Sequence, residues 1–279
     1  MLYSFLGFFN NLIRIITMCE KCQITISDFS NYEMIGKVYV HESVNINMLD
    51  MSIYRYVKFE HLLSMLDSNK LYISNRQKFP DLRERGSKEC LKKIFPLSPI
   101  SNDLEEDKRC RDELHRRWYA SYNICVSCWT KDQYNYGNAK ISSENYLMWK
   151  AYSNGLTCRI ETTIGELINN ISVNNHGFAH DILFSEVKYI QQERYADNNP
   201  QHYIFDKPIY YRDEQEYRLV VLCICNNVCL RINPYKLLKS IKISPFISNS
   251  ESERIINYLK YSFPQLDSIN VSKSHIMEY

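Results

Sequence analysis

The chain has 279 residues, 45% of them hydrophobic, which is enough to build one large domain or two small ones. Its 34 basic residues nearly balance its 32 acidic residues, so no overall charge points to a nucleic-acid partner. There are 7 glycines, and neither G-x-G-x-x-G nor G-x-x-x-x-G-K is present, which excludes the common glycine-rich nucleotide loops. A nucleotide bound by this chain would be held by side chains.

Residues 1–50 show no clear hydrophobic period, and we expect them to form a peripheral N-terminal extension. The opening stretch, MLYSFLGFFNNLIRIITM, lacks a basic n-region and a cleavage site and is shorter than the roughly 20 apolar residues of a membrane span. It could be an amphipathic docking helix, or it could precede an internal start at Met18, Met48 or Met51. Residues 51–279 are expected to form a single α+β domain.

Residues 51–279 alternate between strand-like and helix-like patterns without strict βαβ order, which favours an α+β fold with a mixed or antiparallel central sheet and flanking helices. Leu62, Leu63 and Leu66 share one helical face in a helix that ends at Asn69. The main expected strands are 53–57, 70–75, 122–129, 156–162, 182–190, 216–225, 228–234 and 268–273. The expected helices are 58–69, 100–118, 142–155 (with Ser142 or Ser143 as N-cap), 164–171 and 250–263.

The sequence contains 10 cysteines, many of them inside apolar runs, which indicates buried thiols in a reducing, cytoplasmic setting. Two C-x-x-C pairs exist, Cys19/Cys22 and Cys125/Cys128. They lie much further apart than the roughly 15–20 residues that separate such pairs in zinc ribbons. We therefore expect no metal.

The stretch YYRDEQEYRLVV (210–221) places Glu214 and Glu216 one residue apart, directly before a strongly apolar run. If the strand begins here, both carboxylates share one face, and their mutual repulsion requires a cation or a ligand nearby. One interpretation is a solvated strand entry in which Arg212 and Arg218 screen the acids. The other is a site that meets positive charge.

Several motifs occur in an order that resembles a bacterial domain-of-unknown-function family, the one numbered 2971. They are YRYVKFEHLLSMLDSNKLYISNRQKFPDLRE, CVSCW, NYLMWKAYSNG and YRDEQEYR, and together they span roughly residues 53–222. The chain departs from the family's F-N-D-x-x-E element, because Pro80 and Leu82 accompany Phe79, Asp81 and Glu84.

The same motifs are similar to those of ADP-ribosyltransferases of the arginine–serine–glutamate branch. That resemblance implies that Arg55 grips the pyrophosphate of NAD and that Ser74 or Ser127 supports the nicotinamide ribose. It also implies that Glu216 is the catalytic glutamate, while Glu214 orients the acceptor. NAD would be the substrate, with no metal.

Tyr54 and Tyr56 stand where other branches carry an aromatic residue or histidine, and we expect them to contact the nicotinamide. The resemblance implies a cytoplasmic ADP-ribosyltransferase that modifies RNA or protein and acts as a toxin or anti-phage effector. A messenger RNA acceptor and an antitoxin or chaperone partner belong to the same expectation. The alternative is a non-catalytic module of the same fold that binds a nucleotide or a partner.

Overall fold

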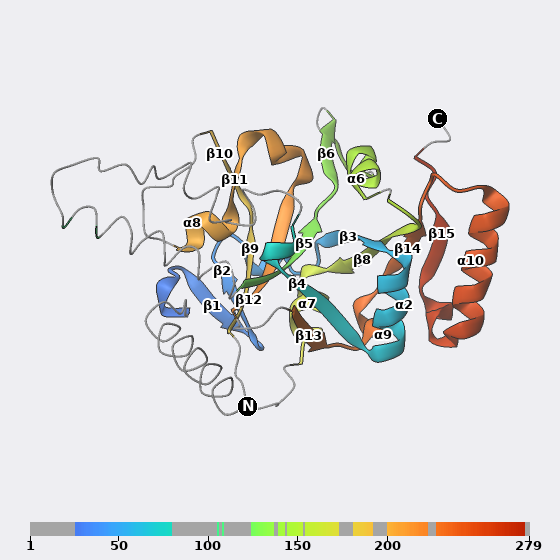
Figure 1. Cartoon of the computed structure of the whole chain (residues 1–279), viewed down its shortest axis with the longest axis horizontal. Coiled ribbons are helices and arrows are strands. Elements are labelled where there is room, and N and C mark those ends of the chain that lie inside the picture. Colours follow the sequence, from blue (N-terminus) through green and yellow to red (C-terminus); the bar gives the residue numbers. More distant parts are fainter. Residues whose placement is uncertain are drawn as a thin grey trace, which may run out of the picture.

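The computed structural model describes residues 26–79, 105, 108, 124–136, 139–142, 144–152, 154–172, 181–191, 200–222 and 227–276. Within these residues, an 11-stranded sheet has the order β1-β2-β9-β12-β5-β3-β8-β14-β15, and β4 and β13 branch from β5 (Figure 1). Its strands are β1 (Tyr32–Ile35), β2 (Val38–His41), β3 (Ser52–Lys58), β4 (Lys70–Asn75), β5 (Ile124–Thr130), β8 (Thr157–Thr163), β9 (Asp181–Glu186), β12 (Glu216–Leu222), β13 (Asn227–Arg231), β14 (Ser240–Ile243) and β15 (Asn270–Lys273).

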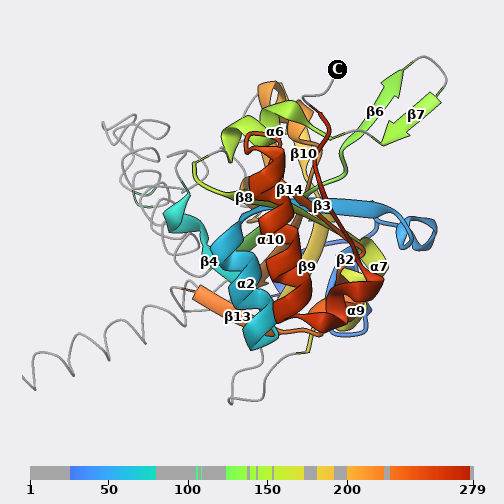
Figure 2. The ribbon, with the colours of Figure 1, turned by 90° about the vertical axis from the view of Figure 1, so that its right-hand side faces the viewer.

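The sheet is mixed, because β2 runs parallel to β9 and β14 runs parallel to β15, whereas the other pairs are antiparallel. Two short pairs lie outside it: the hairpin β6 (Gln133–Tyr136) with β7 (Ala139–Ser142), and β10 (Lys188–Ile190) parallel to β11 (Asp206–Pro208). The hairpin projects away from the body of the molecule (Figure 2). A mixed sheet with flanking helices confirms the expected α+β class.

Helices cover both faces of the sheet. The larger core contains side chains from α2 (Phe59–Ser68), α7 (Ile164–Asn170), α9 (Pro234–Leu237) and α10 (Asn249–Ser262). The smaller core packs Ile204 and Phe205 of α8 (Pro200–Phe205) against Val126 and Val220 of β5 and β12. The described residues also form α6 (Tyr146–Ala151) and the 3-10 turns η1 (Ile26–Asp28), η2 (Ile46–Met48), η3 (Arg76–Lys78), η4 (Ile209–Glu214) and η5 (Pro264–Ser268).

Several elements match the sequence expectations closely. Helix α2 ends where Asn69 adopts a left-handed conformation with φ 54°, and β4 has the expected bounds. Helix α6 differs, because its N-cap is Asn145 and not Ser142 or Ser143. The strand expected at 182–190 is divided into β9 and β10 at Val187. The expected helix 100–118, apart from Glu105 and Lys108, and the Cys19/Cys22 pair lie outside the described residues.

The sequence boundary at residue 50 does not mark the start of the sheet. Strands β1 and β2 fall within the segment expected to be peripheral, and β2 pairs with β9 through Tyr39 and Val40. The side chains of Val38, Val40 and Val44 belong to the larger core. Because each of these strands has four residues, their alternation was too short to register as a period. The described part of this segment is therefore integral to the fold.

Candidate functional site

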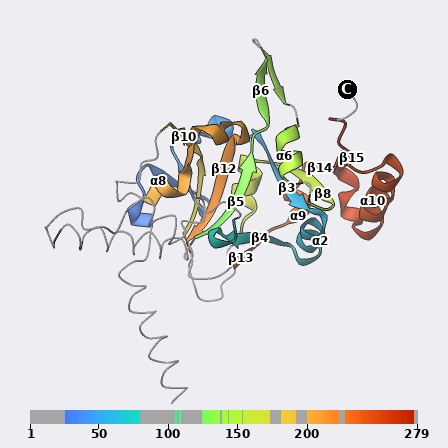
Figure 3. The same cartoon turned by 45° about the horizontal axis from the view of Figure 1, so that its top comes forward.

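The sheet forks along one edge of β5. The other edge pairs with β12 over its full length, from Glu216 opposite Thr130 to Leu222 opposite Ile124. Along the forked edge, β4 pairs through Ser74 opposite Val126, and β3 pairs only at Tyr54 opposite Thr130. Within the described residues, positions 127–129 have no strand partner on this edge. Figure 3 shows β12 beside β5, with β3 beyond it.

The pairing register sorts the residues of β5 by face. Cys128 lies opposite Arg218, so its side chain is on the same face as Glu216 and Arg218. Ser127 lies opposite Leu219 and belongs to the other face, where it accepts a hydrogen bond of 3.0 Å from Trp129 Nε1. The register therefore brings Cys128, and not Ser127, to the face that carries Glu216.

Glu214 and Glu216 come together by a turn and not by strand alternation. Glu214 is the last residue of η4, Gln215 adopts a left-handed conformation with φ 45°, and β12 begins at Glu216. Both carboxylates reach the ammonium of Lys207 on β11, at 2.6 Å for Glu214 Oε2 and 3.0 Å for Glu216 Oε2. Lys207 Nζ also lies 4.8 Å from the centroid of the Tyr211 ring.

The two glutamates differ in their surroundings. The Glu216 side chain is 3% exposed and also pairs with Arg218, whose Nε and Nη2 donate to it at 2.7 and 3.2 Å. Burial alone would raise the pKa of Glu216, but the charges of Arg218 and Lys207 lower it to about 2. The Glu214 side chain is 31% exposed. Glu216 is thus a buried group that is ionised at neutral pH, whereas Glu214 reaches solvent.

Arg55 carries a charge for which the described part of the chain shows no partner. Its guanidinium carbon lies 5.9 Å from the centroid of the Trp129 ring, and among the described residues it has no hydrogen-bonded or ion-paired partner. Burial lowers the pKa of Arg55, and the nearby Cys128 and Tyr152 oppose that shift. Arg55 is half-buried, and such a guanidinium favours an anionic ligand, because a partly desolvated charge is costly without a partner.

Tyr152, the C-cap of α6, connects Arg55 with the glutamates. Desolvation makes the largest contribution and raises the pKa of Tyr152. The pKa is raised further by Cys128, Glu216 and Glu214 and lowered by Arg55. The Tyr152 hydroxyl is thus within electrostatic range of all four groups. Among the described residues, no hydrogen bond or ion pair joins Arg55 to Glu214 or Glu216.

Tyr54 and Tyr56 are packed within the protein. Tyr54 lies under the guanidinium of Arg159, which is 4.1 Å from its ring centroid. The Tyr56 ring stacks on Tyr152 at 6.1 Å and meets Trp149 edge-on at 5.0 Å. Both tyrosines are 4% exposed, whereas Tyr152 is 42% exposed and is the ring of this group that a ligand could reach.

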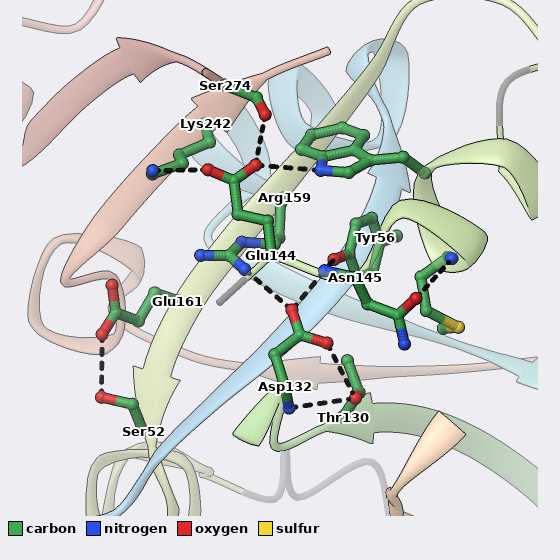
Figure 4. Close-up of polar contacts among 12 residues, drawn as sticks. Ser52, Tyr56, Thr130, Asp132, Glu144, Asn145, Arg159, Glu161, Lys242 and Ser274 are labelled. Carbon is green, nitrogen blue, oxygen red and sulfur yellow. Dashed lines mark hydrogen bonds and ion pairs between the residues drawn. The ribbon is translucent and has the colours of Figure 1, made fainter. Parts of the chain in front are cut away.

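A buried polar network fixes α6 beside the fork (Figure 4). Asp132 accepts hydrogen bonds from Tyr56 Oη at 2.9 Å and from Arg159 Nη1 at 2.8 Å. Burial raises the pKa of Asp132, and Arg159 and these hydrogen bonds oppose it. Glu144 accepts from Lys242 at 2.6 Å and from Ser274, and these partners outweigh burial and lower its pKa.

Asn145 joins this network to the turn that carries Glu214. Its side-chain oxygen caps α6 by accepting from the amides of Leu147 and Met148 at 2.9 and 3.2 Å. Its Nδ2 donates to the main-chain carbonyl of Asp213 at 3.0 Å, and its amide donates to Tyr56 Oη at 3.3 Å.

Sequence reasoning missed Lys207, Cys128, Tyr152 and Asn145 as members of this site. Asn145 carries a readable signal, because asparagine favours the N-cap position. Lys207 carries none, since it belongs to a separate strand pair that only the fold brings to the glutamates. Ser74 lies on β4, across the fork from β3, and makes a long 3.5 Å contact to the carbonyl of Asn75.

Within the described residues, no group of three or more His, Cys, Asp and Glu side chains has the arrangement of a metal site. No helix in the same part of the chain is long and apolar enough to cross a membrane.

No protein-family model and no curated protein matches this chain, so the resemblance to family 2971 has no support from these comparisons. Among solved structures, the chain is similar to that of Thermus sp. 2.9 DarT in complex with NAD+. The match covers 81% of this chain and 96% of that chain, with a TM-score of 0.34 and 12% sequence identity. Similarity at this level leaves the function to be argued from the site itself.

Proposed function

We propose that this protein is an NAD-dependent ADP-ribosyltransferase that modifies a macromolecule, either RNA or protein. The observation that carries the proposal is the guanidinium of Arg55 without a partner among the described residues, which has Tyr152 as an electrostatic neighbour in common with the carboxylates of Glu214 and Glu216. The motif resemblance assigns Arg55 to the pyrophosphate of NAD, Glu216 to catalysis and Glu214 to the acceptor.

The charges at the fork suit an anionic ligand. Glu214 and Glu216 balance Lys207 and Arg218, which leaves the charge of Arg55 uncompensated among these groups. A guanidinium can donate two parallel hydrogen bonds to phosphate oxygens, and this chain has no glycine-rich loop to do so. In this proposal Arg55 binds the pyrophosphate of NAD.

The carboxylates suit the reaction. The bond between nicotinamide and C1′ of the ribose breaks, nicotinamide leaves with the electron pair, and positive charge develops on the ribose. A fixed carboxylate stabilises that charge and can accept the proton that the acceptor's nucleophile loses as it bonds to C1′. Tyr54 and Tyr56 as nicotinamide contacts, and Ser74 or Ser127 as the ribose residue, remain predictions from the sequence.

The test is transfer of label from adenylate-labelled NAD to separate RNA and protein fractions from cells. Wild-type protein should label one fraction, and Arg55→Gln should lose at least nine-tenths of that transfer. Arg254→Gln, which makes the same change at an exposed position on α10, is the matched control and should transfer normally. Absence of transfer to both fractions by the wild type would contradict the proposal.

The alternative is a module that binds a nucleotide without catalysis, and one observation favours it. The Glu216 carboxylate is already engaged by Arg218 and Lys207, as expected of a structural ion pair. Tight NAD binding with neither nicotinamide release nor label transfer would support this alternative.

A role as a cytoplasmic toxin or anti-phage effector, with messenger RNA as acceptor and an antitoxin or chaperone as partner, rests on the resemblance alone. Induced expression in bacteria tests the toxic part of this proposal. Wild-type protein should arrest growth, whereas Arg55→Gln at equal expression should not. Equal growth in the two cultures would argue against a toxin.

A further inference from the structure

Resting on the proposed function, we infer that Glu214 is the carboxylate that touches the substrate, that Lys207 is the positioning residue that holds it, and that Glu216 is a structural partner of Arg218 and Lys207. This reverses the roles that the sequence motif assigns to the two glutamates.

The first reason is the order of the charges. Arg218, Glu216, Lys207 and Glu214 form a chain of alternating charge, joined at 2.7, 3.0 and 2.6 Å. The side chains are 1% exposed for Arg218, 3% for Glu216, 6% for Lys207 and 31% for Glu214. The chain therefore begins inside the protein and ends at a carboxylate that a ligand can reach.

The second reason is the hydrogen-bonding capacity of Glu216. Its Oε1 accepts from Arg218 Nε, and its Oε2 accepts from both Arg218 Nη2 and Lys207 Nζ. A carboxylate that two buried cations already neutralise has little charge left to offer a ribose cation. Glu214 contacts Lys207 at 2.6 Å, and its side chain is 31% exposed, so it keeps solvent access.

The third reason is the way in which Lys207 is held. It lies in β11, where it pairs with Tyr189 of β10, and its ammonium also faces the Tyr211 ring. Tyr189 in turn accepts a 2.9 Å hydrogen bond from the amide of Glu216. Lys207 is thereby fixed relative to β12, so it can orient the side chain of Glu214 at the end of a short 3-10 turn.

The test compares nicotinamide release and NAD affinity in variants that separate the two glutamates. Glu214→Gln keeps the side-chain shape and removes the charge, so kcat should fall about a hundredfold or more while the Kd for NAD changes less than threefold. Glu253→Gln, the same change on an exposed part of α10, is the matched control and should leave both values unchanged.

Glu216 is tested by removing it together with its partner. The double variant Glu216→Gln, Arg218→Met removes one carboxylate and one guanidinium, so Lys207 keeps Glu214 as its acid. Its kcat should remain within tenfold of the wild type, provided that its tryptophan fluorescence and circular dichroism show a folded protein. A folded double variant that loses a hundredfold, beside a Glu214→Gln variant that loses less than tenfold, would overturn the inference.

Lys207 is tested for positioning by replacement and rescue. Lys207→Ala should lower kcat more than it raises the KM for NAD, and added ethylammonium or the conservative Lys207→Arg should restore a measurable part of kcat. Lack of rescue by either would indicate a structural role alone and would count against the inference. If the wild type releases no nicotinamide from NAD, the proposed function fails and this inference falls with it. If the wild type releases nicotinamide and Glu214→Gln is equally active, the inference alone fails.

Discussion

Replacing Glu216 by glutamine is expected to destabilise the fold strongly, because the buried cations Arg218 and Lys207 then lose one of the carboxylates that pair with them. Arg218 would keep the carbonyl of Ile204, at 2.5 Å, and Lys207 would keep Glu214. Removing one partner from a buried ion pair typically costs about 3–5 kcal/mol. The pKa of Glu216, lowered from 4.5 to about 2, corresponds to about 3 kcal/mol of stabilisation at neutral pH.

Urea denaturation at pH 7, followed through the fluorescence of the buried Trp129 and Trp149, measures this loss. Glu216→Gln should lower the free energy of unfolding by about 3 kcal/mol, whereas Glu253→Gln should change it by less than about 0.5 kcal/mol. Adding Arg218→Met to the variant should recover part of the loss, since the guanidinium that lost its carboxylate is then gone. A loss below about 1 kcal/mol for Glu216→Gln would refute the reasoning.

The ion pairs of Glu216 also make the free energy of unfolding depend on pH, and the direction of that dependence follows from the pKa shift. The folded-state pKa of Glu216 is depressed, so its contribution is fully present above the unfolded value of 4.5. That contribution is lost as the pH falls from 4.5 toward about 2. The difference in unfolding free energy between the wild type and Glu216→Gln should therefore shrink across this window. A difference that stays constant from pH 5 to pH 2.5 would contradict the assignment.

Three further predictions address the rest of the fold. Val38→Ala, at a fully buried position of β2, should lower the free energy of unfolding in urea by about 2 kcal/mol. Met34→Ala, on the exposed side of β1, should change it little. Equal small effects of the two variants would show that this segment is peripheral to the core. Asn145→Ala removes the N-cap of α6 and should cost about 1–2 kcal/mol, and an unchanged unfolding midpoint would contradict that role. Tyr56→Phe deletes a buried donor to Asp132 and should cost about 1–3 kcal/mol, and a variant as stable as the wild type would show the bond to be dispensable.

Local sequence signals predicted much of the central fold. The apolar face of α2, its end at Asn69 and the following strand β4 are all determined by neighbouring residues, so periodicity and turn chemistry are sufficient to find them. The N-terminal strands were missed because β1 and β2 are four residues each, and β2 pairs with β9, which is distant in the sequence.

The candidate site was predictable only in part. The paired glutamates and Arg55 were visible as motif residues, but the period-two argument for the glutamates was wrong, because Gln215 turns the chain between them. Lys207, which both carboxylates contact, comes from another strand pair, and no local pattern connects it with them. The contact of Lys207 with the two glutamates depends on the sheet topology, and no short stretch of the sequence reveals that topology.

The central claim is that Arg55 holds NAD at the fork and that NAD is cleaved there. Calorimetric titration with NAD, combined with detection of free nicotinamide by nuclear magnetic resonance, tests both halves with one preparation. Wild-type protein should bind NAD and release nicotinamide, Arg55→Gln should bind about tenfold to hundredfold more weakly, and Arg254→Gln should match the wild type. Wild-type protein that neither binds NAD nor releases nicotinamide, or an Arg55→Gln variant with unchanged affinity, would contradict the claim.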